Sequence, residues 1–264
     1  MTYLSDIEIN INFMKIVVGI PARMGSTRFP GKPLCDILGK PMIEHVYKRS
    51  KLAKTVTDVF MAVCDEEIKK VVENFGGKAV MTPKEISRPG LRVAEACKQL
   101  DLADDDIVVV VQGDEPLVHP RMIEVAVEAF LREPDIFCVN LVKKMTEDEW
   151  LDPNEIKVVT DLKMNALFMS RSPLPSNTRN RLGPRLKQVC IFPFRKKDLL
   201  AFQEMSATPH EVAESIEMLR AIEHGLKVRM VETDFVSKSV DNENDRQAVE
   251  EIMKQDAIYQ QYGF

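Results

Sequence analysis

The chain has 264 residues, enough for one large α/β domain or two small ones, and its 45% hydrophobic and 29% charged residues are ordinary for a globular protein. The formal net charge of −5 argues against general nucleic-acid binding, which needs a basic surface, and no apolar run is long enough to span a membrane. The five scattered cysteines show no CxxC spacing, which indicates reduced thiols in a cytoplasmic protein.

Residues 1–13 lack the basic start and small-residue cleavage site of a signal peptide. We expect them to form a flexible extension before a single domain over residues 14–264.

In the first half of the chain, apolar runs alternate with amphipathic segments. Strands are expected at 15–20, 58–64, 78–82 and 106–114, and helices at 41–53, 65–76, 92–100 and 119–134. Repeated strand–helix units with nearly continuous apolar strands predict an α/β fold whose mostly parallel sheet is covered on both faces.

The pattern changes after about residue 134. Strands at 136–144, 156–161, 165–171 and 187–195 have little helix between them, which predicts an antiparallel, hairpin-bearing insertion over 136–195. A helix at 212–225, a strand at 227–233 and a last helix at 241–253 complete the chain.

Ligands bind to such sheets beyond the carboxyl ends of the strands, and the segment "IPARMGSTRFPGK" (20–32) follows the first strand. Its small residues allow backbone N–H groups to approach an anion closely, and its cations supply positive charge. We therefore predict a phosphate site made by Gly25, Ser26, Thr27, Arg23, Arg28 and Lys32. The alternative is an ordinary loop with solvated basic side chains.

Two acidic motifs follow later strands. In "VQGDEP" (111–116), Asp114 is well placed for Mg²⁺, which takes one or two carboxylates together with phosphate oxygens. The alternative is an acid that caps the helix after Pro120. In "SVDNEND" (239–245), Asp241 considered alone is better explained as a helix N-cap, and only its pairing with Asp114 favours a metal ligand.

The four histidines (His45, His119, His210, His224) share no zinc-site spacing, and most are expected at the surface near helix ends.

The opening motif, extended to "IPARMGSTRFPGKPLCDILGKPMIEHVYKRS", resembles the signature of the 3-deoxy-manno-octulosonate (KDO) cytidylyltransferases, a family of CMP-ulosonate synthetases. "VVVVQGDEPLV", "DPNEIKVVTD", "ALFMSRSPLP" and "SVDNENDRQAVEEI" resemble the family's pattern in the same order, so the similarity spans residues 14–255. It implies a Rossmann-like nucleotide-diphospho-sugar transferase fold and a homodimer, with 136–195 contributing to the sugar pocket and the dimer interface.

The implied reaction transfers CMP from CTP to the anomeric hydroxyl of an acidic sugar, KDO or a close relative, with Mg²⁺, and releases pyrophosphate. Such an activated sugar serves lipopolysaccharide or capsule synthesis. Carried over by motif, the metal ligands are Asp114 and Asp241, and these two with Arg23 and Lys32 form the catalytic set. The implied nucleotide-binding residues are Ala22, Arg23, Gly25, Ser26, Lys32, Arg92 and Gln112. The implied sugar-binding residues are Asn154, Arg171, Gln188 and Glu217.

The sequence departs from the family at two places. "ISRPGLR" stands where the family has "SGTDR" or "SGTER", so that Arg92 alone clearly survives in a loop that borders the nucleotide. Near the sugar pocket, Gln188, Cys190, Phe192, Pro193 and Met218 replace the family's usual histidine, glycine, tyrosine, glycine and glutamine. We hypothesise an acceptor related to KDO but not KDO itself, since lost hydrogen-bonding groups shift specificity. The alternative is neutral repacking.

Other functions are weaker. A cytidylyltransferase of the acylneuraminate type is the nearest alternative. A glycosyltransferase that uses a nucleotide-sugar donor would normally carry a DxD motif, which "GDEP" is not. A non-catalytic nucleotide-binding relative would not release pyrophosphate from CTP.

Overall fold

The computed structural model describes residues 14–25, 29–176, 179 and 183–263. Its first sheet has the order β11-β6-β1-β4-β5. The strands are β1 (Ile16–Ala22), β4 (Asp58–Val63), β5 (Ala79–Met81), β6 (Ile107–Val111) and β11 (Ile191–Arg195). The first four are parallel, and β11 runs antiparallel to β6. The predicted, mostly parallel α/β sheet is confirmed.

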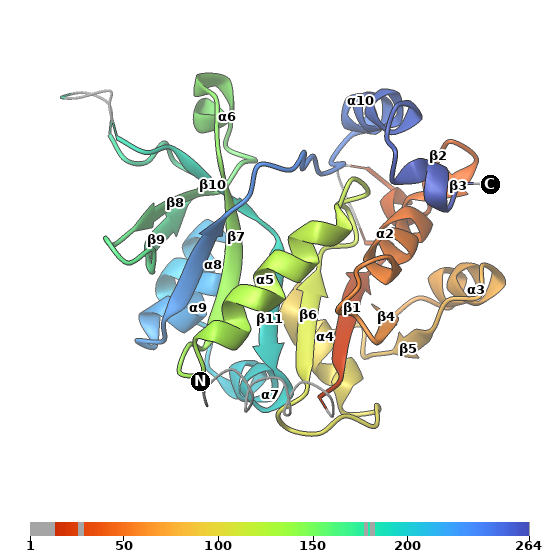
Figure 1. The fold of residues 1–264 in the computed structure, drawn as a ribbon, viewed down its shortest axis with the longest axis horizontal. Coiled ribbons are helices and arrows are strands. Elements are labelled where there is room, and N and C mark those ends of the chain that lie inside the picture. Colours follow the sequence, from red (N-terminus) through yellow and green to blue (C-terminus); the bar gives the residue numbers. More distant parts are fainter. Residues whose placement is uncertain (1–13, 26–28, 177–178, 180–182, 264) are drawn as a thin grey trace, which may run out of the picture.

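Helices cover both faces of this sheet (Figure 1). They are α2 (Met42–Lys51), α3 (Glu66–Asn74), α4 (Pro89–Cys97), α5 (Pro120–Arg132) and α7 (Lys196–Glu204). Successive side chains of β1 point to opposite faces of the sheet. Ile16 and Val18 pack in the apolar cluster with α2, α3 and α5, whereas Val17 packs in the cluster with α4 and α7. Burial on both faces explains why the strand sequences are apolar without interruption.

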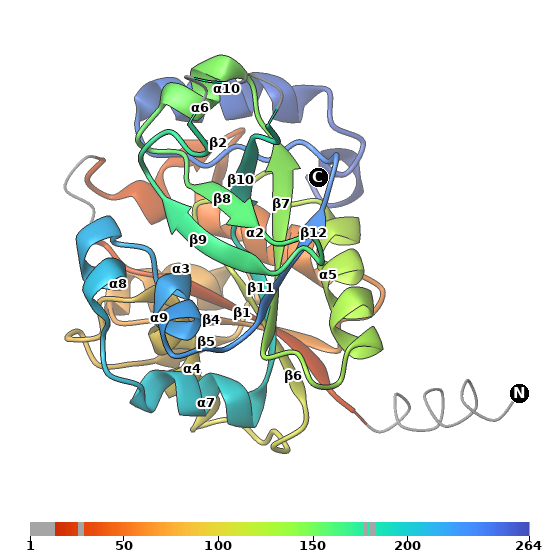
Figure 2. The same cartoon turned by 90° about the vertical axis from the view of Figure 1, so that its left-hand side faces the viewer.

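The second sheet has the order β12-β7-β10-β8-β9 and faces the viewer in Figure 2. Its strands are β7 (Cys138–Lys144), β8 (Lys157–Thr160), β9 (Ala166–Ser170), β10 (Leu186–Val189) and β12 (Val228–Glu232). Strands β7 to β10 pair antiparallel, as predicted for the insertion, and β12 joins parallel to β7 from beyond it. Three short helices lie in the connections of this sheet: α6 (Glu147–Leu151) follows β7, and α8 (Pro209–Glu214) and α9 (Met218–Glu223) precede β12.

Two of the predicted elements are wrong in extent. The single strand expected at 187–195 divides at Cys190: β10 belongs to the second sheet, and β11 returns to the first. The helix expected at 212–225 is two helices, because Ser215 adopts a left-handed backbone conformation with φ 56° that stops α8. Periodicity misses both breaks because the flanking residues keep the same apolar pattern.

The C-terminal part of the chain lies beside the start of α2 (Figure 1). It contains α10 (Glu243–Lys254) and the short 3₁₀ turn η2 (Tyr259–Gln261), and it contacts the small hairpin of β2 (Asp36–Ile37) and β3 (Lys40–Pro41), which follows the turn η1 (Lys32–Leu34). A separate apolar cluster fills the space between these parts: Ile37, Met42, Leu117, Val240, Val249 and Met253. We call it the C-terminal cluster.

Two further expectations concern single residues. Cys64, Cys97 and Cys138 are buried and all five cysteines have free thiols, as predicted. His45 is an exception to the expectation that most of the histidines lie at the surface: it is fully buried, and its ring contacts the Tyr262 hydroxyl and the carbonyl of Ile37. Within the described ranges, no helix has the length and apolarity needed to cross a membrane.

Candidate active site

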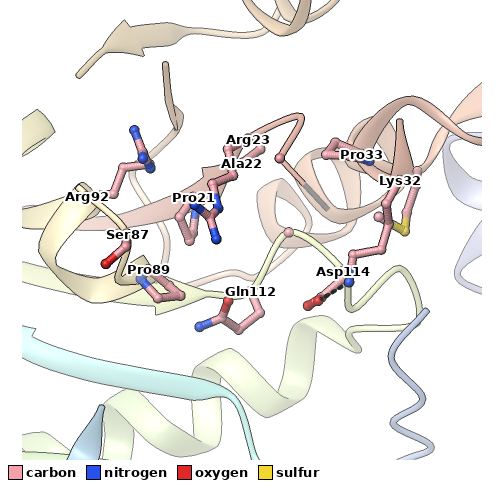
Figure 3. Close-up of a pocket in the computed structure, with 13 residues that line it drawn as sticks. Pro21, Ala22, Arg23, Lys32, Pro33, Ser87, Pro89, Arg92, Gln112 and Asp114 are labelled. Atoms are coloured by element: carbon pink, nitrogen blue, oxygen red, sulfur yellow. Dashed lines mark hydrogen bonds and ion pairs between the residues drawn. The ribbon is translucent and has the colours of Figure 1, made fainter. Parts of the chain in front are cut away.

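A cavity of about 300 Å³ lies at the carboxyl ends of β1 and β6, where ligands of open parallel sheets bind. Its lining comes from the segment after β1, the segment after β6 and the start of α4 (Figure 3). The lining residues are Pro21, Ala22, Arg23, Gly25, Lys32, Pro33, Met42, Ser87, Pro89, Arg92, Gln112, Gly113 and Asp114.

At one end of the cavity, the Lys32 ammonium group lies between two carboxylates. Its Nζ is 2.7 Å from Asp114 Oδ2 and 3.1 Å from Asp241 Oδ1. Burial alone would lower the pKa of this lysine, but the charges and hydrogen bonds of the two carboxylates raise it above its usual value. Three residues that are distant in sequence are therefore brought together around one charged centre.

The two carboxylates are not helix caps. The N-cap of α10 is Asn242, whose side chain accepts a hydrogen bond from the Asp245 N–H, so Asp241 does not serve there. The N-cap of α5 is His119, which accepts from the Arg121 N–H, so Asp114 does not cap that helix either. The capping alternatives for both aspartates are wrong.

Gly113 sets the distance between the two main strands of the site. A Cβ atom at this position would lie 2.6 Å from the backbone oxygen of Pro21 in β1. Only glycine allows the "QGD" segment to pass this close to the end of β1. The close approach places Asp114 beside Lys32 in the segment that follows β1.

Arg23 lies at the mouth of the cavity, and its side chain is exposed. The preceding strand and the next residue fix its backbone, because the Met24 N–H donates to Asp65 Oδ2 at 2.9 Å. Gly25 also lines the cavity, whereas Ser26, Thr27 and Arg28 lie outside the described residues. A positive side chain and a glycine therefore face the same space as Lys32.

Arg92 lines the cavity, but its guanidinium group is directed elsewhere. It donates to Thr82 Oγ1 at 2.6 Å and to the carbonyls of Pro83 and Ile86, and the side chain is 2% exposed. It fixes the loop between β5 and α4, and Figure 3 shows its end turned away from Gln112. Ser87 of this loop and Pro89 at the start of α4 line the cavity and were not singled out as site residues from the sequence.

The four residues assigned to the sugar occupy other places. Glu217 accepts from the N–H groups of Gly90 and Leu91 at the start of α4, and burial raises the pKa of its carboxyl group. Arg171 donates to the backbone oxygens of Glu214, Pro153 and Asn154. Gln188 donates to Asn140 Oδ1 at 2.7 Å.

Asn154 is exposed in the loop between α6 and β8, and both its backbone N–H and its side-chain amide donate hydrogen bonds to Asp152 Oδ1. None of these four sugar residues lines the 300 Å³ cavity.

Two of the unusual residues near the expected sugar pocket are core residues. Phe192 is 5% exposed and Met218 is 2% exposed, and both belong to the apolar cluster on the α4 side of the first sheet. Their burial agrees with neutral repacking at these two positions. Gln188 and Cys190 are half-buried, and the altered-acceptor hypothesis depends on them.

Glu115 is a further acidic residue to which the sequence motif gave no role. Burial and then the neighbouring Asp114 charge raise the pKa of its carboxyl group to about 8, and the Ser237 hydroxyl donates to it at 3.1 Å.

The donor set at Lys32 is compatible with magnesium. Mg²⁺ usually takes one or two carboxylates and fills its other positions with water and substrate phosphate oxygens. Asp114 and Asp241 already hold one positive charge between them. In the described part of the chain, no group of three or more His, Cys, Asp and Glu side chains could hold a metal ion by itself.

The geometry agrees with the comparisons with known proteins. The family model described as "Cytidylyltransferase" matches residues 17–241. The chain belongs to the cytidylyltransferase family. The match begins in β1 and ends at Asp241, so it includes every segment that lines the cavity.

Curated cytidylyltransferases are similar over nearly the whole chain. An 8-amino-3,8-dideoxy-manno-octulosonate cytidylyltransferase of Shewanella piezotolerans is 43% identical over 234 residues, covering 88% of this chain and 96% of that protein. A 3-deoxy-manno-octulosonate cytidylyltransferase of Geotalea uraniireducens is 41% identical over 254 residues, covering 91% and 100%. The two names differ in the group at carbon 8 of the sugar.

A solved structure of a cytidylyltransferase has the same fold. CMP:2-keto-3-deoxy-manno-octonic acid synthetase, solved in complex with CTP, matches with a TM-score of 0.84 and 35% identity. The match covers 91% of this chain and 99% of that one. The predicted nucleotidyltransferase fold is confirmed.

Proposed function

We propose that this enzyme transfers CMP from CTP to the anomeric hydroxyl of a 3-deoxy-octulosonate sugar and releases pyrophosphate. The observation that carries the proposal is the Lys32 ammonium between Asp114 and Asp241 at the edge of a cavity that Arg23 and Gly25 also line. The relatives that share this architecture are named for KDO and for its 8-amino analogue.

In this reaction the anomeric oxygen attacks the α-phosphorus of CTP, and the bond from that phosphorus to the oxygen bridging to the β-phosphate breaks. Pyrophosphate leaves, and the hydroxyl proton passes to solvent. Negative charge grows on phosphate oxygens, so positioning and electrostatic stabilisation can supply most of the catalysis. Among the described lining residues, Arg23 and Lys32 would supply the positive charge that stabilises these oxygens.

Asp114 and Asp241 would hold a magnesium ion. When bound, it would polarise the α-phosphate and lower the pKa of a coordinated hydroxyl group. Lys32 would then exchange its carboxylate partners for triphosphate oxygens, since one ammonium and one metal ion cannot occupy the same space. Gln112 and the backbone near Ala22 lie where the rest of the nucleotide would contact the cavity.

The identity of the acceptor sugar depends on residues near the second sheet. Arg171 supplies a cation near the second sheet, but it already holds the loop containing Asn154. Gln188 and Cys190 remain as the differences that could favour a sugar with an altered peripheral group. We propose a KDO-type octulosonate as the acceptor, and the altered-acceptor hypothesis favours the 8-amino analogue, for which one relative is named, over KDO itself.

The test is a pyrophosphate-release assay that crosses CTP, UTP and ATP with KDO, 8-amino-KDO and an acylneuraminate. Rapid release with CTP and either octulosonate supports the proposal, and the ratio of their kcat/KM values identifies the acceptor. Full efficiency with KDO would overturn the altered-acceptor hypothesis. Release only with an acylneuraminate, or with no sugar at all, would contradict the proposed reaction.

We also propose a homodimer built on the second sheet. Leu167 in the edge strand β9 is 56% exposed, and Leu162 in the β8–β9 turn is fully exposed. An edge strand that exposes apolar side chains is a template for pairing with another chain.

A further inference from the structure

Arg49 is one of the most deeply buried charged residues of the molecule, although it does not line the cavity. It projects from α2 and is 2% exposed. Its Nε donates to the carbonyl of Val118 at 2.7 Å, and one Nη donates to the carbonyl of Leu117 at 3.3 Å. Its other Nη pairs with Asp256 Oδ2 at 2.5 Å.

These acceptors belong to the two segments that carry the candidate metal ligands. Leu117 and Val118 follow Asp114 in the segment between β6 and α5. Asp256 lies just after α10, the helix that begins directly after Asp241 and Asn242. One guanidinium group therefore joins the Asp114 segment to the far end of the Asp241 helix.

Other contacts complete the same connection. The Val240 N–H donates to the carbonyl of Asp114 at 3.0 Å, so the two segments also touch beside the carboxylates. Leu117, Val240 and Met253 pack together in the C-terminal cluster. Three contacts therefore hold the Asp114 segment against the Asp241 segment and its helix: the hydrogen bond beside the carboxylates, the C-terminal cluster, and Arg49 at the far end of α10.

We propose that Arg49 is a positioning residue that sets the geometry of the Asp114–Asp241 pair for the metal–nucleotide complex. The inference rests on the proposed function, because it assumes that these aspartates hold the metal. Without the guanidinium group, two buried carbonyls and a carboxylate lose their donor, which favours relaxation of both segments toward water. Substitution of residues that orient metal ligands without binding the metal typically lowers metal affinity by about 10- to 100-fold.

A merely structural arginine would affect stability alone, and the molecule contains a matched example. Arg220 in α9 is 4% exposed, pairs with the buried Glu211 at 2.7 Å and donates to the carbonyls of Phe202 and Met205. Like Arg49, it pairs with one carboxylate and donates to two backbone carbonyls, but it is not among the residues that line the cavity. Arg220→Met is therefore the control for losing a buried guanidinium group.

The experiment measures Mn²⁺ binding by electron paramagnetic resonance in the presence of CTP and without any acceptor sugar, so that no turnover is required. The variants are Arg49→Met, Arg49→Lys, Asp256→Asn, Arg220→Met and Asp114→Asn, and the thermal midpoint of each is recorded. We expect Arg49→Met to weaken Mn²⁺ binding at least about tenfold and Arg49→Lys and Asp256→Asn to weaken it less. Arg220→Met should lower the midpoint and leave Mn²⁺ binding unchanged.

Equal weakening in Arg49→Met and Arg220→Met would overturn the inference, as would unchanged binding in Arg49→Met. If Arg49→Met does not fold, the comparison of Arg49→Lys and Asp256→Asn with Arg220→Met decides in the same way. If Asp114→Asn binds Mn²⁺ as tightly as the wild type, the metal assignment itself is wrong. That result is distinct from a failure of the Arg49 inference.

Discussion

Asp114 has the most specific residue-scale role in the proposed reaction, and Asp114→Asn tests it. The change keeps the shape of the side chain but removes a charge that pairs with Lys32 at 2.7 Å and that would hold the metal. We expect kcat to fall at least about 100-fold, as for the loss of a main charge-stabilising group. Asp101→Asn is the control, because Asp101 is fully exposed and pairs with Lys15 at the opposite end of β1. Near-wild-type pyrophosphate release by Asp114→Asn would remove the metal role.

Gly113 tests whether the close approach of the two strands matters. In Gly113→Ala the new methyl group meets the Pro21 carbonyl, and backbone cannot rotate away as a side chain could. The segment that carries Asp114 must shift, and displacements of about 1 Å at such sites cost about 100-fold in rate. We expect this loss in kcat with a circular dichroism spectrum like that of the wild type. An active Gly113→Ala enzyme would show that the segment tolerates displacement.

At the scale of elements, the docking of the C-terminal segment on α2 should depend on pH. His45 of α2 is fully buried against Tyr262, and burial lowers its pKa from 6.5 to about 4. The unfolded chain therefore binds a proton between pH 6.5 and 4 that the folded chain does not. The stability that neutral His45 permits is present above pH 6.5 and is lost as the pH falls, by about 3 kcal/mol at most.

Thermal unfolding at pH 7 and pH 5 measures this effect. The wild-type midpoint should fall more between the two pH values than that of His45→Gln, whereas His224→Gln, at an exposed position after α9, should keep the wild-type slope. Equal slopes in the wild type and His45→Gln would contradict the assignment.

The elements that could be predicted from the sequence are those whose pattern is local. β1, β4 and β6 are continuous apolar runs, and α3 and α5 have clear periodicity, so their bounds agree closely with the prediction. The division at Cys190 could not be predicted in this way, since it depends on which sheet each half of the strand joins. The break at Ser215 depends on one backbone angle that serine rarely adopts.

The site could be predicted in part for the same reason. Lys32, Asp114 and Gln112 follow strand ends, and topology alone brings strand ends together. The support behind them is tertiary: Arg49, His45 and the C-terminal cluster come from helices whose packing partners are far away in the sequence. Arg92 is assigned to the nucleotide from its motif position, but a motif position does not reveal that its guanidinium group holds a loop.

At the scale of the whole molecule, the two sheets divide the work. The first sheet supplies the cavity in which we propose that the nucleotide binds, and the second carries Gln188, the adjoining Arg171 and the exposed edge at β9. We predict that light scattering gives twice the mass of one chain. Leu167→Asp should shift the protein toward the monomer, while Ile252→Asp on α10, outside the segment 136–195, tests whether a charge at any exposed apolar position has this effect. A wild-type monomer would contradict the proposed dimer.

The most direct test of the central claim is a crystal structure with CTP and Mn²⁺, in which anomalous scattering locates the metal. We predict one Mn²⁺ held by Asp114, Asp241 and a phosphate oxygen, with Lys32 moved onto the triphosphate and Arg23 beside it. A metal bound by other residues, or a triphosphate outside the cavity between β1 and β6, would contradict the account.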